Sequence, residues 1–246
     1  MGVLEGKRAL VTGGSRGIGR SIVTRLAADG AEVAFSYLHR HSDAAEVAAA
    51  VEAAGGRAHP LQADLRQVPD LRQLFDQAGN RLGGLDILVN NVGLMLRATL
   101  RDTTEEQFDA MIALNAKVTF FAIQEAIKQM ADGGRIVNIS STATVLGHPS
   151  QAAYGASKAA VEQITRVAAR SLISRGITVN VVAPGGIETE SSVGDASPEV
   201  IAQWRRPTAT GRLGLPEDIA DIVAFLAGPD SRWLTGQTIR AAGGAV

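Results

Sequence analysis

Short apolar segments alternate with helix-like segments along the whole chain, and this alternation most constrains the fold. Most of these segments are rich in aliphatic and β-branched residues, and they end near glycine, proline or polar residues. Strands without a polar face belong to a parallel sheet that helices cover on both sides. We therefore predict one doubly wound α/β domain spanning 1–246, with about seven parallel strands, at 9–12, 32–37, 57–62, 85–89, 135–139, 177–183 and 236–241.

The composition excludes several classes of function. The 246 residues carry a net charge of −1, which gives no electrostatic basis for binding nucleic acid or an anionic membrane. Because cysteine is absent, disulfides and thiolate chemistry are excluded, and the four histidines form no ligand cluster, so no metal site is expected. The start runs almost directly into the first strand, which leaves no room for a removable apolar segment. No apolar run approaches the roughly 18 residues that a membrane helix needs. We expect a cytoplasmic protein.

A glycine-rich turn, TGGSRGIG at residues 12–19, follows the first strand and opens a helix. In that context glycines let the backbone approach a pyrophosphate, which the helix N-terminus attracts. Gly13 permits the tight turn, Gly17 the close approach, and Gly19 close packing of helix and strand. The alternative is a βα turn whose glycines serve packing alone.

Tyr154 and Lys158 are four residues apart in a helix expected over 151–174, so they share one face. Hydride delivery to a ketone needs a proton donor for the oxygen, and a phenol can supply that proton. An ammonium nearby favours the phenolate, so Lys158 is expected to lower the pKa of Tyr154. Taken alone, the pair is also common on surface helices without any catalytic role.

Further landmarks follow in a fixed order: NNVG at 90–93, Asn115, Ser141 at the end of IVNISS, and PGGIET at 184–189. With the glycine-rich turn and the YxxxK pair, the chain resembles a classical short-chain dehydrogenase/reductase over its whole length. It is most similar to 3-oxoacyl-[acyl-carrier-protein] reductases and related carbonyl reductases. The resemblance implies a Rossmann fold.

The resemblance also implies roles for four residues. Tyr154 would be the acid/base, and Lys158 its tuner and a ribose ligand. Ser141 would orient the substrate, with Ser140 an adjacent competitor that the family spacing disfavours. Asn115 would hold a water molecule that links Lys158 to solvent.

The second strand ends without an acid, at Ser36-Tyr37-Leu38-His39-Arg40. An acid there would bind the ribose hydroxyl of NAD(H) and repel a 2′-phosphate. Arg16 and Arg40 suit that phosphate, so NADP(H) is favoured, although both arginines could be solvated surface charges. The cofactor-binding residues expected in all are Gly13, Ser15, Arg16, Gly17, Ile18, Gly19, Tyr37, Arg40, Asp64, Leu65, Asn91, Gly93, Tyr154, Lys158, Pro184, Gly185, Ile187 and Thr189.

Two positions depart from the family pattern. Val92 replaces the usual alanine of NNAG, and Ala242 stands where relatives commonly carry an aspartate before paired glycines. The weakly patterned segment 187–214 is where the family places its substrate lid, and its residues do not name a substrate.

The predicted function is NADPH-dependent reduction of a ketone, either a 3-oxoacyl thioester, which a carrier protein could present, or a related carbonyl compound. The alternatives are an NAD(H)-dependent alcohol or sugar dehydrogenase and a nucleotide sensor without turnover. The helices expected at 103–131 and 151–174 carry more apolar residues than one sheet face can cover. The alternative is that all of these residues face the sheet. The resemblance implies that these helices pair in a homotetramer.

Overall fold

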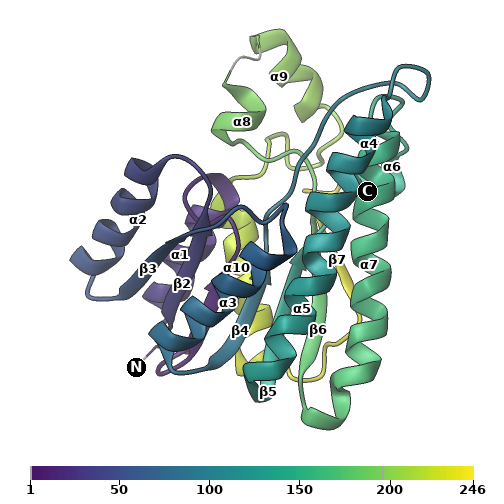
Figure 1. Ribbon diagram of the computed structural model, residues 1–246. Helices are drawn as coiled ribbons and strands as arrows, with labels where there is room; N and C mark the ends of the chain where they lie inside the picture. The colour runs from purple at the N-terminus through teal and green to yellow at the C-terminus, as the bar shows by residue number, and fades with distance from the viewer. Residues whose placement is uncertain (1, 195–196) are drawn as a thin grey trace.

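The computed structural model describes residues 2–194 and 197–246. Within them, seven parallel strands form one sheet in the order β3-β2-β1-β4-β5-β6-β7 (Figure 1). The predicted doubly wound, single-domain Rossmann fold is confirmed. The strands are β1 Arg8–Val11, β2 Glu32–Tyr37, β3 Arg57–Gln62, β4 Leu85–Asn90, β5 Met130–Ile139, β6 Thr178–Pro184 and β7 Thr238–Ala241.

Helices cover both faces of the sheet. One face carries α1 (Gly17–Ala28), α2 (His41–Ala53) and α10 (Pro216–Ala227). The other carries α3 (Val68–Leu82), α5 (Val118–Gln129) and α7 (Ala152–Leu172), with α5 and α7 side by side (Figure 1). Shorter elements are α4 (Glu105–Met111), α6 (Ala143–Leu146), the 3-10 turns Ile173–Arg175 and Pro229–Ser231, and two helices described below.

Successive residues of the central strands enter different cores. Ala9 and Val11 of β1 pack under α1 and α10, whereas Leu10 between them packs under α3 and α5. Side chains alternate between the faces of a strand, so a sheet with two covered faces needs apolar residues at every position. This explains why the strands carry no polar alternation.

The long helix predicted at 103–131 is interrupted and ends earlier. Thr104 is its N-cap and forms a capping box with Gln107. A π-helical turn at Ile112–Lys117 separates α4 from α5. Met130 starts β5, five residues before the predicted strand, because it pairs with Leu85 ahead of a bulge.

Two other boundaries differ from the predictions. Arg40, in the left-handed region with φ 30°, precedes α2, so Ser42 is not its N-cap. The weakly patterned segment contains α8 (Glu190–Val193) and α9 (Pro198–Arg205), which were not predicted. Residues 195–196 of the predicted lid lie outside the described residues.

One helical stretch, Glu105–Gln129, is long and apolar enough to cross a membrane by length and mean hydropathy. No apolar run of this length was predicted here, because polar residues interrupt the apolar residues of the helix. Half of its most apolar window is buried inside the molecule, where α5 packs on α3 and α7.

Candidate active site

The site lies at the carboxyl edge of the sheet, where β1 and β4 are neighbours. The chain leaves β1 for α1 on one face and β4 for α4 and α5 on the other. Such a switch in direction leaves a crevice between the two loops, the usual ligand position in open α/β sheets.

The turn after β1 has no room for larger residues. A Cβ on Gly19 would lie 1.9 Å from the carbonyl oxygen of Gly13, and Gly13 itself has φ +71°. Gly17 also has positive φ, +51°. The glycines therefore serve a backbone conformation that other residues cannot adopt without strain.

The start of α1 suits an anion. Arg16 occupies the N-cap in an extended conformation, and among the described residues no side chain caps this first turn. Ser15 is half-buried in the turn, and Ile18 packs against the core beneath it. Backbone N–H groups and the positive end of the helix dipole therefore fit a dinucleotide pyrophosphate.

Asn91 braces the turn from β4. Its Nδ2 donates to the carbonyl oxygens of Thr12 and Gly13, each at 3.0 Å, and its backbone N–H donates to Thr12 Oγ1. A Cβ on Gly13 would meet the Val92 side chain at 2.8 Å, so Val92 occupies the space above the turn. Thr12 is a supporting residue that the sequence analysis did not assign.

Ser141, Tyr154 and Lys158 come together from the end of β5 and the start of α7. The Ser141 side chain lies near enough to the Tyr154 hydroxyl to lower the pKa of the phenol. Lys158 Nζ, which is buried, donates to the carbonyl oxygen of Ile139 at 2.9 Å. The proton donor, its hydrogen-bonding partner and the ammonium thus share one corner of the sheet edge.

Asn115 joins the same corner through the π-helical turn. Its Nδ2 donates to Leu94 O at 2.9 Å and to Ser157 Oγ at 2.8 Å, while its Oδ1 accepts from Leu94 N–H. A Cβ on Gly93 would lie 3.0 Å from both Asn115 Oδ1 and Lys158 Nζ. Gly93 therefore keeps open the space between the amide and the ammonium.

Burial moves the pKa values of the two titratable residues in opposite directions. It lowers the pKa of Lys158 from 10.5 to about 8. It raises the pKa of Tyr154 above its ordinary value, against a smaller lowering by the hydrogen bond to Ser141. The pKa of Tyr154 is therefore raised on balance, because burial of the phenol dominates. The lowering of this pKa by Lys158 stays a prediction.

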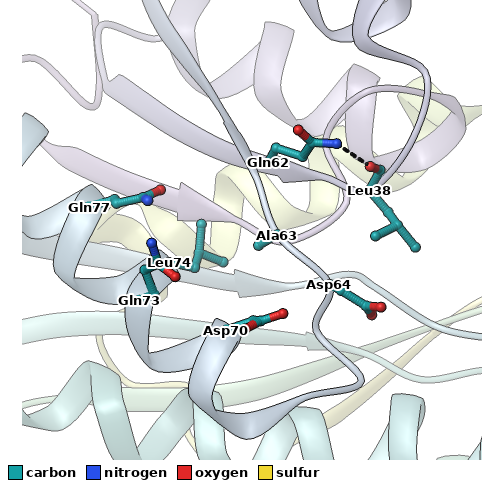
Figure 2. Close-up of a pocket in the computed structure, with 8 residues that line it drawn as sticks. All are labelled: Leu38, Gln62, Ala63, Asp64, Asp70, Gln73, Leu74 and Gln77. Carbon is teal, nitrogen blue, oxygen red and sulfur yellow. Dashed lines mark hydrogen bonds between the residues drawn. The ribbon is translucent and has the colours of Figure 1, made fainter.

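The adenine end of the predicted site contains a cavity of about 300 Å³ (Figure 2). Its lining residues are Leu38, Gln62, Ala63, Asp64, Asp70, Gln73, Leu74 and Gln77. Asp64 faces this cavity and is also bound by Arg66, which keeps the pKa of the carboxyl low. Leu65 is buried in the core below α3, and the Tyr37 hydroxyl is hydrogen-bonded to His41 Nδ1 at 2.8 Å. Neither side chain lines the cavity.

The two arginines assigned to the 2′-phosphate differ. Arg16 is exposed and, within the described residues, its guanidinium makes no hydrogen bond or ion pair. Arg40 is also exposed, but its guanidinium binds Glu190 of α8 at 3.0 Å and Asp43 of α2 at 3.4 Å. The structure therefore ties Arg40 to the predicted lid.

The segment after β6 closes the other side. Pro184 O accepts a hydrogen bond from Thr142 N–H, and Gly185 N–H donates to Ala241 O. A Cβ on Gly185 would lie 3.0 Å from Ala242, so Ala242 packs closely against this turn. Ile187 is buried and forms a bridge with Gly214.

Thr189, at the start of α8, faces the glycine-rich turn. A Cβ on Gly17 would lie 3.4 Å from the Thr189 methyl group. Gly17 and Thr189, which are far apart in the sequence, therefore lie next to each other at the predicted site. Among the described residues, no group of His, Asp and Glu has the geometry of a metal site.

Comparison with known proteins agrees with this arrangement. The family described as enoyl-(acyl carrier protein) reductase matches residues 13–246. A hydroxynaphthalene reductase-like protein, Arp2 of Metarhizium brunneum, is 40% identical, covering 99% of this chain and 96% of its own.

Two solved structures are similar over nearly the whole chain. A short-chain dehydrogenase/reductase from Serratia marcescens has a TM-score of 0.95 and 42% identity, covering 98% of both chains. The angucycline C-6 ketoreductase LanV, with bound NADP, has a TM-score of 0.95 and 46% identity, covering 99% of this chain and 97% of its own. The fold and site define a dinucleotide-dependent oxidoreductase. The chain belongs to the short-chain dehydrogenase/reductase family.

Proposed function

We propose that the protein reduces a ketone to a secondary alcohol with NADPH. The observation that carries this proposal is the grouping of Ser141, Tyr154 and the buried Lys158 at the same sheet edge as the uncapped α1. A nucleotide sensor without turnover has no need of this assembled acid/base group.

Ser141 and Tyr154 have different roles in the proposed reaction. Bound nicotinamide supplies the hydride. Ser141 would donate a hydrogen bond to the carbonyl oxygen and fix its position next to the Tyr154 hydroxyl. Tyr154 is protonated at neutral pH because an ordinary tyrosine has a pKa of about 10, and burial raises the pKa further. Its proton is therefore available to the oxygen on which negative charge develops.

Lys158 and Asn115 support this proton transfer. Lys158 would hold the nicotinamide ribose and favour the transient phenolate left on Tyr154. The Asn115 side chain makes three hydrogen bonds, with Leu94 and Ser157. Asn115 would hold a water molecule that returns a proton toward Lys158. The backbone of the glycine-rich turn and Asn91 would form the phosphate end of the site.

The NADP(H) preference rests on the end of β2, where no acid stands, and on the uncommitted charge of Arg16. The NADP bound to LanV supports it. The NAD(H)-dependent dehydrogenase is the second candidate, since Glu190 places a negative charge beside Arg40. Binding titrations with NADPH and NADH separate the two.

The ketone is a 3-oxoacyl thioester or a related compound, and the segment 187–214 would act as the lid over it. The names of Arp2 and LanV add cyclic and aromatic ketones to the candidates. NADPH oxidation measured with β-ketoacyl thioesters, β-ketoesters, cyclic and polycyclic ketones and sugars tests the function. Turnover of any ketone class supports ketone reduction, whereas oxidation of alcohols or sugars with NAD⁺ alone would contradict it.

We also propose a cytoplasmic homotetramer. Phe108, Phe120 and Val167 remain exposed on the outer faces of α4, α5 and α7, whereas Met111 and Val161 are buried in the single chain. Exposed aromatic residues on adjacent helices are typical of an interface. Phe120→Glu should dissociate the oligomer and lower activity, as light scattering and assay would show. A fully active wild-type monomer at assay concentration contradicts the proposal.

A further inference from the structure

Glu162 lies two helical turns after Tyr154 and one after Lys158 on α7. Its side chain is buried, with a relative exposure of 7%, and within the described residues it has no ion-pair partner. A buried carboxylate is costly unless it is paired or hydrogen-bonded. Glu125, equally buried on α5, has Arg72 and Lys128 as partners. Glu162 therefore needs another explanation.

Hydroxyl groups take the place of a cation at Glu162. Its Oε1 accepts hydrogen bonds from Ser140 Oγ at 3.1 Å and from Thr144 Oγ1 at 2.8 Å. Ser140 is buried at the end of β5, and Thr144 lies in α6. One carboxylate oxygen thus fastens two separate segments to α7.

These two segments are the two sides of Ser141. Ser140 precedes it directly, and Thr144 Oγ1 also lies 3.0 Å from the Ser141 carbonyl oxygen. Ser141 Oγ accepts from the Ala143 N–H in the same turn, at 3.2 Å. Fastening both sides of this turn to α7 fixes Ser141 relative to Tyr154 and Lys158, which the same helix carries.

We propose that Glu162 is a positioning residue that holds Ser141 at the correct distance from Tyr154. This inference rests on the proposed role of Ser141 in the reaction. Glu162 acts through Ser140 and Thr144, and contacts with the substrate or the cofactor are not required of it.

The first test is Glu162→Ala, with Glu125→Ala as the control of equal burial. Displacement of a reacting group by about 1 Å can cost of order 10² in rate, so kcat should fall roughly 10- to 100-fold. KM for the ketone and Kd for NADPH should change little, because the cofactor residues are untouched. Glu162→Gln keeps the acceptor oxygen and should restore most of kcat.

Thr144→Val provides a second route should Glu162→Ala fold poorly. It removes one of the two hydroxyls, keeps the side-chain shape, and should lower kcat in the same direction but by less. If neither Thr144→Val nor a folded Glu162→Ala lowers kcat more than Glu125→Ala does, the positioning role is wrong.

A double-mutant cycle with Ser141→Ala separates positioning from general structural damage. If Glu162 acts through Ser141, adding Glu162→Ala to Ser141→Ala should change kcat less than about twofold. Multiplicative losses would overturn the inference. If Ser141→Ala itself leaves kcat unchanged, the proposed function fails rather than only the role of Glu162.

Discussion

The two ends of the nucleotide crevice are built differently. At the acid/base end, Lys158 and Asn115 are buried, and hydrogen bonds within the protein fix both of them. At the end predicted for the 2′-phosphate, Arg16 and Arg40 are exposed, and in the described part of the chain only the guanidinium of Arg40 has partners, on α2 and α8.

The difference separates chemistry from cofactor choice. Buried, hydrogen-bonded groups are held before any ligand arrives, as transition-state stabilisation requires. Exposed charges interact weakly and are easily re-paired, so they can tune which nucleotide binds without disturbing the reaction. Changes at the first end should alter kcat, and changes at the second end should alter nucleotide discrimination.

The largest effect should come from Tyr154→Phe, which removes only the hydroxyl. We expect kcat to fall by a factor of order 10² or more, the range that general acid catalysis supplies. The Kd for NADPH should stay unchanged, since the ring is retained. Steady-state kinetics and a binding titration check both; near-full turnover would remove Tyr154 from the mechanism.

At the other end, Arg16→Ala should weaken NADPH binding by about tenfold. One charge-assisted hydrogen bond contributes roughly 1.5–3 kcal/mol, and about 1.4 kcal/mol corresponds to a factor of ten. NADH binding should hardly change, and kcat at saturating NADPH should be retained. Equal losses for both nucleotides, measured by fluorescence titration, would show that Arg16 does not contact the 2′-phosphate.

Arg40 should give a smaller effect, because Glu190 and Asp43 already neutralise its charge. We expect Arg40→Ala to cost less NADPH affinity than Arg16→Ala does. Glu190→Gln should instead improve NADPH affinity up to about fivefold, the range of an exposed ion pair, without changing NADH affinity. The neighbouring exposed Glu188 offers the control Glu188→Gln. Equal responses of Glu188→Gln and Glu190→Gln would refute a specific effect of the Arg40–Glu190 pair.

The buried Lys158 should also make the stability of the folded protein depend on pH. Its folded pKa, about 8, lies below the ordinary 10.5, so between these values the unfolded chain binds more protons. Its contribution to stability therefore rises with pH across that window, by at most about 1.4 kcal/mol per pH unit. Urea unfolding at pH 8, 9 and 10 should show this rise in the wild type and a flatter profile in Lys158→Met. Parallel profiles would contradict burial of the charged amine.

The same contrast explains what the sequence could predict. The bounds of β2 and β3 were correct because glycines mark clear breaks before them, at Gly30 and at Gly55-Gly56. The glycine-rich turn could be predicted because larger residues do not fit there. A Cβ on Gly19, for example, would lie 1.9 Å from the carbonyl oxygen of Gly13. Local patterns of this kind depend little on the rest of the molecule.

Features set by distant contacts were not readable. The π-helical turn that carries Asn115 has no local signal, and the Arg40–Glu190 pair joins residues 150 positions apart. Leu65 was assigned to the adenine but lies in the core, because only tertiary packing decides which way that loop faces. The role we infer for Glu162 likewise depends on three elements that meet only in the fold.

The central claim is hydride transfer to a carbonyl with Tyr154 as proton donor, and isotope transfer tests it most directly. Wild-type enzyme, NADPH with deuterium in both positions of the nicotinamide C4 carbon and the best ketone from the screen should yield an alcohol with deuterium on the carbinol carbon. Tyr154→Phe, with NADPH bound to the same extent, should yield almost none. An unlabelled alcohol from the wild type would contradict the account. So would an equal amount of labelled alcohol from Tyr154→Phe.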